Sequence, residues 1–199
     1  MRPKTPTLLI GALLLLGGGW WIGVAAIVTS HWPAAYAGHA GSPSVAALPS
    51  GDATAGALTG DFAVRIIART NQYRVEHGCP ALAPNPILMR TAQAHSADMA
   101  THDFVGHNSS SGATIGQRIK AAGYTYTLVA ENIAWGQQTP EQVVDLWFNE
   151  SPPNDAHRRN ILNCQLREIG VGYVYLASDP GKVTAHTYWT EDFGTRPAP

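Results

Sequence analysis

The sequence predicts an α+β domain in which helices pack against a small antiparallel sheet, with one apolar helix before it at the N-terminus. Two observations support this class. Residues 61–162 contain several segments with helical apolar spacing and clear capping residues. Two segments rich in β-forming residues follow at 168–176 and 183–193, separated by a turn.

The first 37 residues have the pattern of an export signal or signal-anchor. Arg2 and Lys4 precede an apolar run at 8–28, which at about 21 residues is long enough to cross a bilayer as a transmembrane helix. Residues 35–37 (Ala-Tyr-Ala) form a small-residue cleavage site, so a cleaved signal peptide and a retained anchor both fit the sequence. In either case the basic residues stay inside and we expect the rest of the chain to be exported.

Residues 38–59 consist mostly of Ala, Gly, Ser and Pro, which predicts a flexible linker. The remaining residues, 60–199, are enough for one domain with its own core. Apart from Arg2 and Lys4, the chain has 11 basic and 14 acidic residues, a balance of −3 that argues against a nucleic-acid partner.

Capping signals define the helices. Asp61 is a predicted cap for a helix that stops at Gly78, and Asn85-Pro86 begins a second helix that runs to about Thr101. On the second helix, His95 lies on the apolar side, and we expect a core or boundary histidine with a hydrogen bond.

The second half of the domain alternates loops with short elements. Thr114 begins a short helix that ends near Gly123, residues 124–134 read as an extended segment, and residues 139–142 (Thr-Pro-Glu-Gln) form a capping box. Two prolines make 151–155 a loop, and 157–162 is a short turn or helix. The turn at 178–181 joins the last two segments into an antiparallel hairpin.

Cys79 and Cys164 are the only cysteines. An even number of cysteines in an exported chain favours a disulfide, although two buried thiols are an alternative. The bond would close a loop of roughly 85 residues, for which chain-entropy estimates give about 4–5 kcal/mol.

Four residues beside loops or helix ends carry the candidate chemistry: His107, Glu131, Glu150 and His157. Imidazoles and carboxylates bind divalent metal ions or move protons, and we expect folding to bring these four into one cleft. Glu150 follows the end of a helix, where the macrodipole disfavours a negative charge, so a nearby cation or proton donor is expected.

Six motifs follow one another along the domain: Phe-Val-Gly-His at 104–107, Ala-Glu-Asn-Ile-Ala at 130–134, Trp-Phe-Asn-Glu at 147–150, His-Arg-Arg-Asn-Ile-Leu at 157–162, Gly-Val-Gly-Tyr at 170–173 and Tyr-Trp-Thr-Glu-Asp-Phe-Gly at 188–194. In this order they resemble the CAP superfamily, the group of cysteine-rich secretory, antigen-5 and pathogenesis-related-1 proteins with its exported bacterial members. The resemblance covers about 62–194 and implies an α-β-α sandwich with an open cleft. It also implies that His107, Glu131, Glu150 and His157 correspond to the family's two-histidine, two-glutamate tetrad. Residues 151–156 lengthen the path from Glu150 to His157, a departure from many bacterial members.

Three interpretations of the tetrad stay open. Two imidazoles favour zinc or a similar ion, bound weakly because catalytic zinc usually has three protein ligands. The residues could instead form only a hydrogen-bonded network. A hydrolase, peptidase-like and acting in the cell envelope, would use a metal-held water activated by Glu131 or a serine of 109–111 beside His107. We expect a binding protein rather than a conventional enzyme.

The family is also linked to lipid or sterol binding and to cell-envelope interaction, which implies a lipid or envelope ligand. Six aromatic residues near the site would suit an apolar ligand, although most of them, Trp147 and Trp189 above all, are expected in the core: Phe104, Trp135, Trp147, Phe148, Tyr188 and Trp189. The expected location is extracellular or, if the apolar segment is retained, membrane-anchored on the outer face of the cytoplasmic membrane.

Overall fold

The computed structural model describes residues 52–198, with side chains from residue 60 onward. In chain order its elements are α1 (Asp52–Glu76), β1 (Ala83–Pro84), α2 (Pro86–Thr101), α3 (Ile115–Ala121), β2 (Leu128–Trp135), α4 (Pro140–Phe148), α5 (Ala156–Ile161), β3 (Glu168–Tyr175) and β4 (Thr187–Thr195). The predicted apolar segment 8–28 lies outside the described residues. No helix within 52–198 is long and apolar enough to span a membrane.

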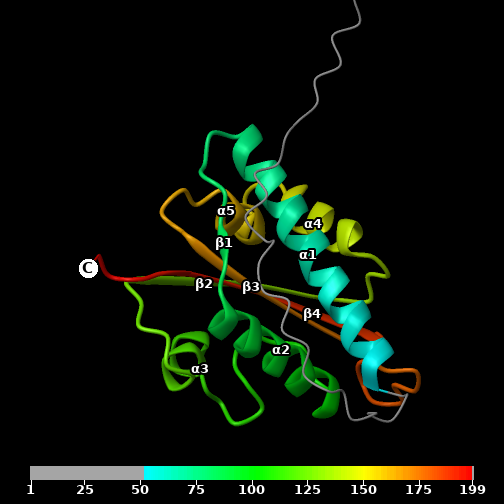
Figure 1. The fold of residues 1–199 in the computed structure, drawn as a ribbon. Coiled ribbons are helices and arrows are strands. Elements are labelled where there is room, and N and C mark those ends of the chain that lie inside the picture. Colours follow the sequence, from blue (N-terminus) through cyan, green and yellow to red (C-terminus); the bar gives the residue numbers. More distant parts are fainter. Residues whose placement is uncertain (1–51, 199) are drawn as a thin grey trace, which may run out of the picture. The chain divides into compact units, whose positions relative to one another are not determined.

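Within the described residues, the sheet has four strands in the order β1-β3-β4-β2. The pairs β3–β4 and β4–β2 are antiparallel, whereas the two-residue β1 pairs in parallel with β3. Helices α1, α4 and α5 lie on one side of this sheet and α2 and α3 on the other, as Figure 1 shows. The predicted α+β class and α-β-α sandwich are therefore confirmed. β1 was missed because two residues in a proline-rich link carry no strand pattern.

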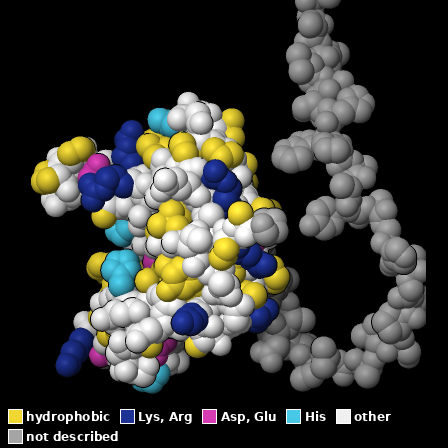
Figure 2. All heavy atoms as spheres, turned by 90° about the vertical axis from the view of Figure 1, so that its left-hand side faces the viewer, with side chains coloured by type: hydrophobic (Ala, Val, Ile, Leu, Met, Phe, Trp, Pro, Cys, Tyr) yellow, Lys and Arg dark blue, Asp and Glu magenta, His cyan; other side chains and the backbone are white. Residues whose placement is uncertain are grey.

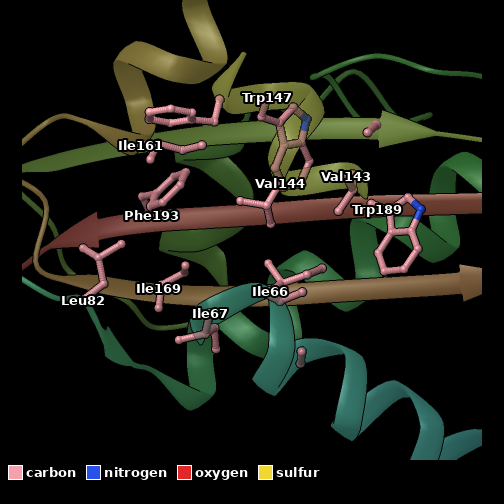
Figure 3. Close-up of a cluster of buried hydrophobic side chains, with 14 of the residues drawn as sticks. Ile66, Ile67, Leu82, Val143, Val144, Trp147, Ile161, Ile169, Trp189 and Phe193 are labelled. Atoms are coloured by element: carbon pink, nitrogen blue, oxygen red, sulfur yellow. The ribbon is translucent and has the colours of Figure 1, made fainter. Parts of the chain in front are cut away.

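The larger core lies between the sheet and the α1, α4 and α5 layer (Figure 3). Its centre is formed by Trp147 and Trp189, which are both fully buried. Each indole N–H finds a backbone acceptor, at Ile133 for Trp147 and at Gln137 for Trp189, both at 3.0 Å. A smaller apolar cluster of Leu88, Ile119 and Tyr124 lies on the α2 and α3 side.

Three of the predicted helix starts are confirmed by their caps. The Asn85 side chain accepts hydrogen bonds from two amides of the first turn of α2. Thr114 and Thr139 form capping boxes with Gln117 and Gln142 at the starts of α3 and α4. These bonds satisfy amides that have no partner inside the helix.

The start of α1 differs from the prediction. The helix begins at Asp52, so Asp61 lies inside it, and residues 52–59 of the predicted linker are helical. Ala and Leu are strong helix formers, and three alanines and one leucine within 52–59 extend the helix beyond the expected cap. The predicted stop is correct, because Gly78 has a left-handed φ of 79° just after α1 ends.

The connection between β3 and β4 is longer than the predicted tight turn, because β4 begins at Thr187 rather than 183. Two aspartates organise this connection. Asp179 accepts from the amides of Ala185 and His186 and from the hydroxyl of Tyr188. Asp103, from the loop after α2, accepts from the amides of residues 182 and 183. Because amides in 182–186 bond to these two side chains, residues 183–186 do not join the β3–β4 ladder.

The predicted disulfide is confirmed: Cys79 and Cys164 are bonded, with their Cα atoms 4.9 Å apart. It joins the end of α1 to the segment after α5. Beside it, the fully buried Arg74 donates hydrogen bonds to four backbone carbonyls, those of residues 80, 161, 163 and 166. Together the disulfide and this guanidinium fix the C-terminal end of α1 to the α5 segment.

Candidate functional site

The first of two histidine–glutamate pairs joins the loop after α2 to β2. Nδ1 of His107 lies 2.8 Å from Oε1 of Glu131. The His107 side chain is 55% exposed, whereas that of Glu131 is only 2% exposed. Arg118 of α3 donates to the other Glu131 oxygen and, at 2.6 Å, to the backbone carbonyl of His107. The buried carboxylate is thus paired with a cation, as burial of a charge requires.

The second pair joins the end of α4 to α5. Oε1 of Glu150 lies 2.5 Å from Nδ1 of His157, and Oε2 accepts from the His157 amide at 3.0 Å. The N-cap residue Asp155 makes no side-chain capping bond, so Glu150 supplies the carboxylate at the start of α5. The donor expected near this negative charge is therefore His157.

The two pairs flank β2, which is an edge strand. Asn160 of α5 donates to the backbone carbonyl of Glu131 at 3.1 Å and to the side chain of Asn132 at 2.9 Å. Asn132 in turn donates to the His157 carbonyl at 3.4 Å. These bonds hold α5 against the residues that carry the first pair.

The pairs come from opposite layers of the sandwich, since His107 follows α2 and His157 belongs to α5. Because no further strand lies beyond an edge strand, side chains from both helix layers can meet at the solvent-exposed side of β2. Figure 2 shows exposed histidine side chains near the middle of the face that contains α3 and α5, with an acidic side chain close by. Among the described residues, no group of three or more His, Cys, Asp or Glu side chains is arranged to hold a metal ion.

Two buried carboxylates of β4 lie directly behind the site. Asp192 is opposite Glu131 in the sheet register and Glu191 is opposite Asn132. Burial, and next the charge of Glu131, raises the pKa of Asp192 well above its ordinary value. Burial also raises the pKa of Glu191 to about 7, although hydrogen bonds from Thr70 and Asn132 partly oppose this. Burial and the neighbouring Glu131 carboxylate therefore both favour the protonated form of Asp192.

His95 is buried, as expected from its place on α2, and it also reaches the site. Its Nε2 donates to the carbonyl of Gly106 at 2.8 Å and lies 3.9 Å from Oε2 of Glu131. Burial lowers the pKa of His95, so the ring is neutral. Arg118, Asn132, Asn160 and Asp192 were missed as site residues. Asn132, Asn160 and Asp192 lie inside motifs already noted in the sequence, and the two adjacent carboxylates Glu191-Asp192 stand out in a predicted strand, whereas Arg118 had no signal.

The other candidates, six aromatic residues and the serines of 109–111, make no hydrogen bond to either histidine. Most of the six aromatic residues are core, as expected: Trp147, Phe148, Tyr188 and Trp189 are buried, and of the six only Trp135 is largely exposed, at 49%. Ser109 bonds to Ser111 and to a backbone amide, and Ser110 bonds to Asp98. Within 60–198 no hydroxyl lies within hydrogen-bonding distance of the imidazole of His107 or His157.

Comparison with known proteins agrees with the fold and the motifs. The family model described as "CAP: Cysteine-rich secretory protein family" matches residues 67–193. The uncharacterized protein YkwD of Bacillus subtilis (strain 168) is 32% identical over 152 residues, which cover 76% of this chain and 54% of that protein.

Solved structures show the same fold. An extracellular protein containing a SCP domain from Bacillus anthracis superposes with a TM-score of 0.59 at 28% identity, covering 76% of this chain and 45% of that chain. An outer surface protein from Borrelia burgdorferi has a TM-score of 0.55 at 22% identity, covering 66% and 90%. The chain thus spans about half the length of the two Bacillus proteins that it matches. On its motifs, its fold and the family model, the chain belongs to the CAP family of cysteine-rich secretory proteins.

Proposed function

We propose that this protein is an exported CAP-domain protein that binds a divalent metal ion, preferably zinc, through His107 and His157. In this proposal Glu131 and Glu150 hold the two imidazoles. Export is supported by the disulfide, which is typical of oxidising compartments, and by relatives described as extracellular or outer-surface proteins. Membrane anchoring through residues 8–28 stays a prediction.

The observation that supports metal binding is the same at both histidines: the Nδ1 atom faces a carboxylate. Because a carboxylate only accepts hydrogen bonds, Nδ1 carries a proton, and in the neutral ring Nε2 then has a lone pair. None of the hydrogen bonds within 60–198 uses Nε2 of either ring. A carboxylate behind Nδ1 is the usual partner of a metal-binding histidine, because it fixes the tautomer and raises the basicity of the ring.

The donor set fits a weakly held, exchangeable ion. Two imidazole ligands are fewer than the three protein ligands of typical catalytic zinc sites, so water would complete the coordination. When bound, the ion would act as a Lewis acid toward a ligand at the cleft. The chain's own residues orient the ligands: the glutamates fix the two imidazole rings, and Arg118 forms an ion pair with Glu131.

Other functions have less support. The described residues provide no positioned serine nucleophile, so a hydrolase would need a metal-held water, and catalysis stays an untested alternative. Burial of most of the aromatic residues removes the aromatic argument for an apolar cleft. A lipid or envelope ligand stays a prediction, which a lipid pull-down with the purified protein can test.

The test is calorimetric titration of zinc into the full-length protein and four variants, one of them a control. His107→Ala and His157→Ala should each abolish most of the binding, because each removes one of two protein ligands. Glu150→Gln should weaken it by about tenfold or more through loss of the orienting carboxylate. His77→Ala, an exposed histidine at the end of α1, is the matched control. Equal zinc affinity in the wild type and both histidine variants would show the proposal to be wrong.

A further inference from the structure

Asp192 of β4 is a buried carboxyl group directly behind the proposed metal site. It has no exposure to solvent, and the strand register places it opposite Glu131. Side chains of opposite residues in an antiparallel pair lie on the same face of the sheet, with their Cβ atoms about 4.5–5.5 Å apart. Thr91 of α2 donates to Oδ2 of Asp192 at 2.7 Å, so both carboxyl groups lie on the α2 side of the sheet.

The other oxygen of Asp192, Oδ1, is buried and has no donor among the described residues. On the β3 side of Asp192, α2 closes over the sheet. Gly170 is opposite Asp192 there, and a Cβ at Gly170 would lie 2.0 Å from the backbone of Leu88. An ionised carboxylate with a single hydroxyl donor would be costly to bury in this place. A protonated Asp192 avoids that cost, but its O–H then needs an acceptor.

The acceptor is Glu131. Burial, the charge of Glu131 and a hydrogen bond between the two carboxyl groups all raise the pKa of Asp192, whereas Thr91 and Arg118 oppose the shift. Two ionised carboxylates cannot form a hydrogen bond with each other, because both only accept, so the pair holds a proton. The proton belongs on Asp192, since the two oxygens of Glu131 already accept from His107 and Arg118.

Three donors therefore hold the Glu131 carboxylate, which offers about four acceptor positions. His107 lies on the loop after α2 and is 55% exposed, and Arg118 lies on the short helix α3. Asp192, in contrast, lies on a strand that is paired on both sides. Its O–H is thus the donor that ties Glu131 to the rigid centre of the sheet.

We propose that Asp192 is a positioning residue: as a neutral acid it donates its Oδ1–H to Glu131 and so fixes the carboxylate that orients the imidazole of His107. The role in zinc binding rests on the proposed function. The donated proton and the tautomer of His107 exist without a metal ion, so both tests use the metal-free, full-length protein. Failure of zinc binding would leave their outcome unchanged.

The first test is infrared difference spectroscopy at neutral pH, with the spectrum of Asp192→Asn subtracted from that of the wild type. Asparagine has nearly the shape of a protonated aspartate, so the fold should be kept. The difference should contain the C=O band of a protonated carboxylic acid, and this band should shift in D₂O. Asp61→Asn, at an exposed position, should give no such band. If Asp192→Asn removes only carboxylate bands, Asp192 is ionised and the proposal is wrong.

The second test measures the tautomer of His107 from its ring ¹⁵N signals, at a pH where the ring is neutral. Asp192→Leu removes the donor, which frees Glu131 to turn away from Nδ1. The ratio of the Nδ1–H to the Nε2–H form should then fall by about fivefold. Asp192→Asn should recover most of the ratio, because its amide donates to Glu131 while its oxygen accepts from Thr91.

A matched control separates positioning from a general loss of stability. Phe193→Leu weakens the core on the other face of β4 without touching Glu131, and it should leave the His107 tautomer ratio unchanged. If Asp192→Leu does not fold, the smaller Asp192→Ala is measured in the same way. An unchanged ratio in the folded variant, or an equal change in Phe193→Leu, would overturn the positioning role.

Discussion

Glu191 makes the stability of this domain depend on pH in a direction opposite to that of most carboxylates. The side chain is fully buried, and burial raises its pKa from 4.5 to about 7. Below pH 4.5 the group is protonated in both the folded and the unfolded state. Between pH 4.5 and 7 only the unfolded state loses the proton, so the free energy of unfolding falls as pH rises. One pKa unit corresponds to about 1.4 kcal/mol, so the loss contributed by this group reaches about 3 kcal/mol above pH 7.

Glu191→Gln should remove this dependence because an amide does not titrate. The hydrogen bonds can be kept: the amide oxygen accepts from Asn132, and the amide nitrogen donates to the Thr70 hydroxyl, which can rotate to accept. The variant and the wild type should have similar stability near pH 4.5. At pH 8 the variant should be more stable by about 3 kcal/mol, a figure that already includes the opposing charge of Arg74.

Urea unfolding at half-unit steps from pH 4.5 to 8.5, with the disulfide intact, measures the difference. Asp61→Asn, an exposed carboxylate on α1, controls for the general effect of removing one negative charge. If the wild type and Glu191→Gln give parallel profiles, Glu191 does not carry a raised pKa, and the inference of a protonated carboxyl in this part of the core is wrong.

The other predictions concern the framework around the site. Reducing the Cys79–Cys164 bond should lower the melting temperature and the free energy of unfolding, the latter by about 2–5 kcal/mol. An unchanged melting curve, in a sample whose free thiols are shown by titration, would contradict a stabilising role. Arg74→Met should lower the free energy of unfolding by about 3 kcal/mol or more in urea, because two buried and two partly buried carbonyls lose their donor; a loss below 1 kcal/mol would mean that water replaces the guanidinium. Gly172→Ala should lower the free energy of unfolding by about 1–3 kcal/mol, because the added Cβ would lie 2.3 Å from the backbone of Ala92 and push α2 off the sheet. An unchanged unfolding midpoint would refute this tight contact.

The sequence was most informative where structure depends on neighbouring residues. The capping boxes at Thr114 and Thr139 and the Asn85 cap are local patterns of three or four residues, and each begins a helix as predicted. The start of α1 was misplaced because Asp61 has the chemistry of a cap, whereas the helix continues back to Asp52 through a segment with three alanines and one leucine.

The site was only partly predictable, because its contacts depend on residues that are not neighbours in the sequence. The residues that contact the glutamates come from distant segments: Arg118 meets Glu131 across 13 positions, and Asn160 meets it across 29. No periodicity marks such contacts. That the tetrad forms two histidine–glutamate pairs depends on how the loop after α2 meets β2 and on how the chain returns from α4 to α5, which only the fold determines. Asp192 was missed for the same reason, because only the register of β2 and β4 places it opposite Glu131.

The central claim is that the imidazoles of His107 and His157 bind one metal ion together, from opposite layers of the sandwich. The most direct measurement is a zinc titration of the ¹⁵N-labelled full-length protein, followed at the Nε2 signal of each ring. We predict that both signals move in parallel and that both changes are complete at one zinc ion per chain. A titration in which either Nε2 signal stays unmoved, or in which the two saturate at different zinc concentrations, would contradict a shared site.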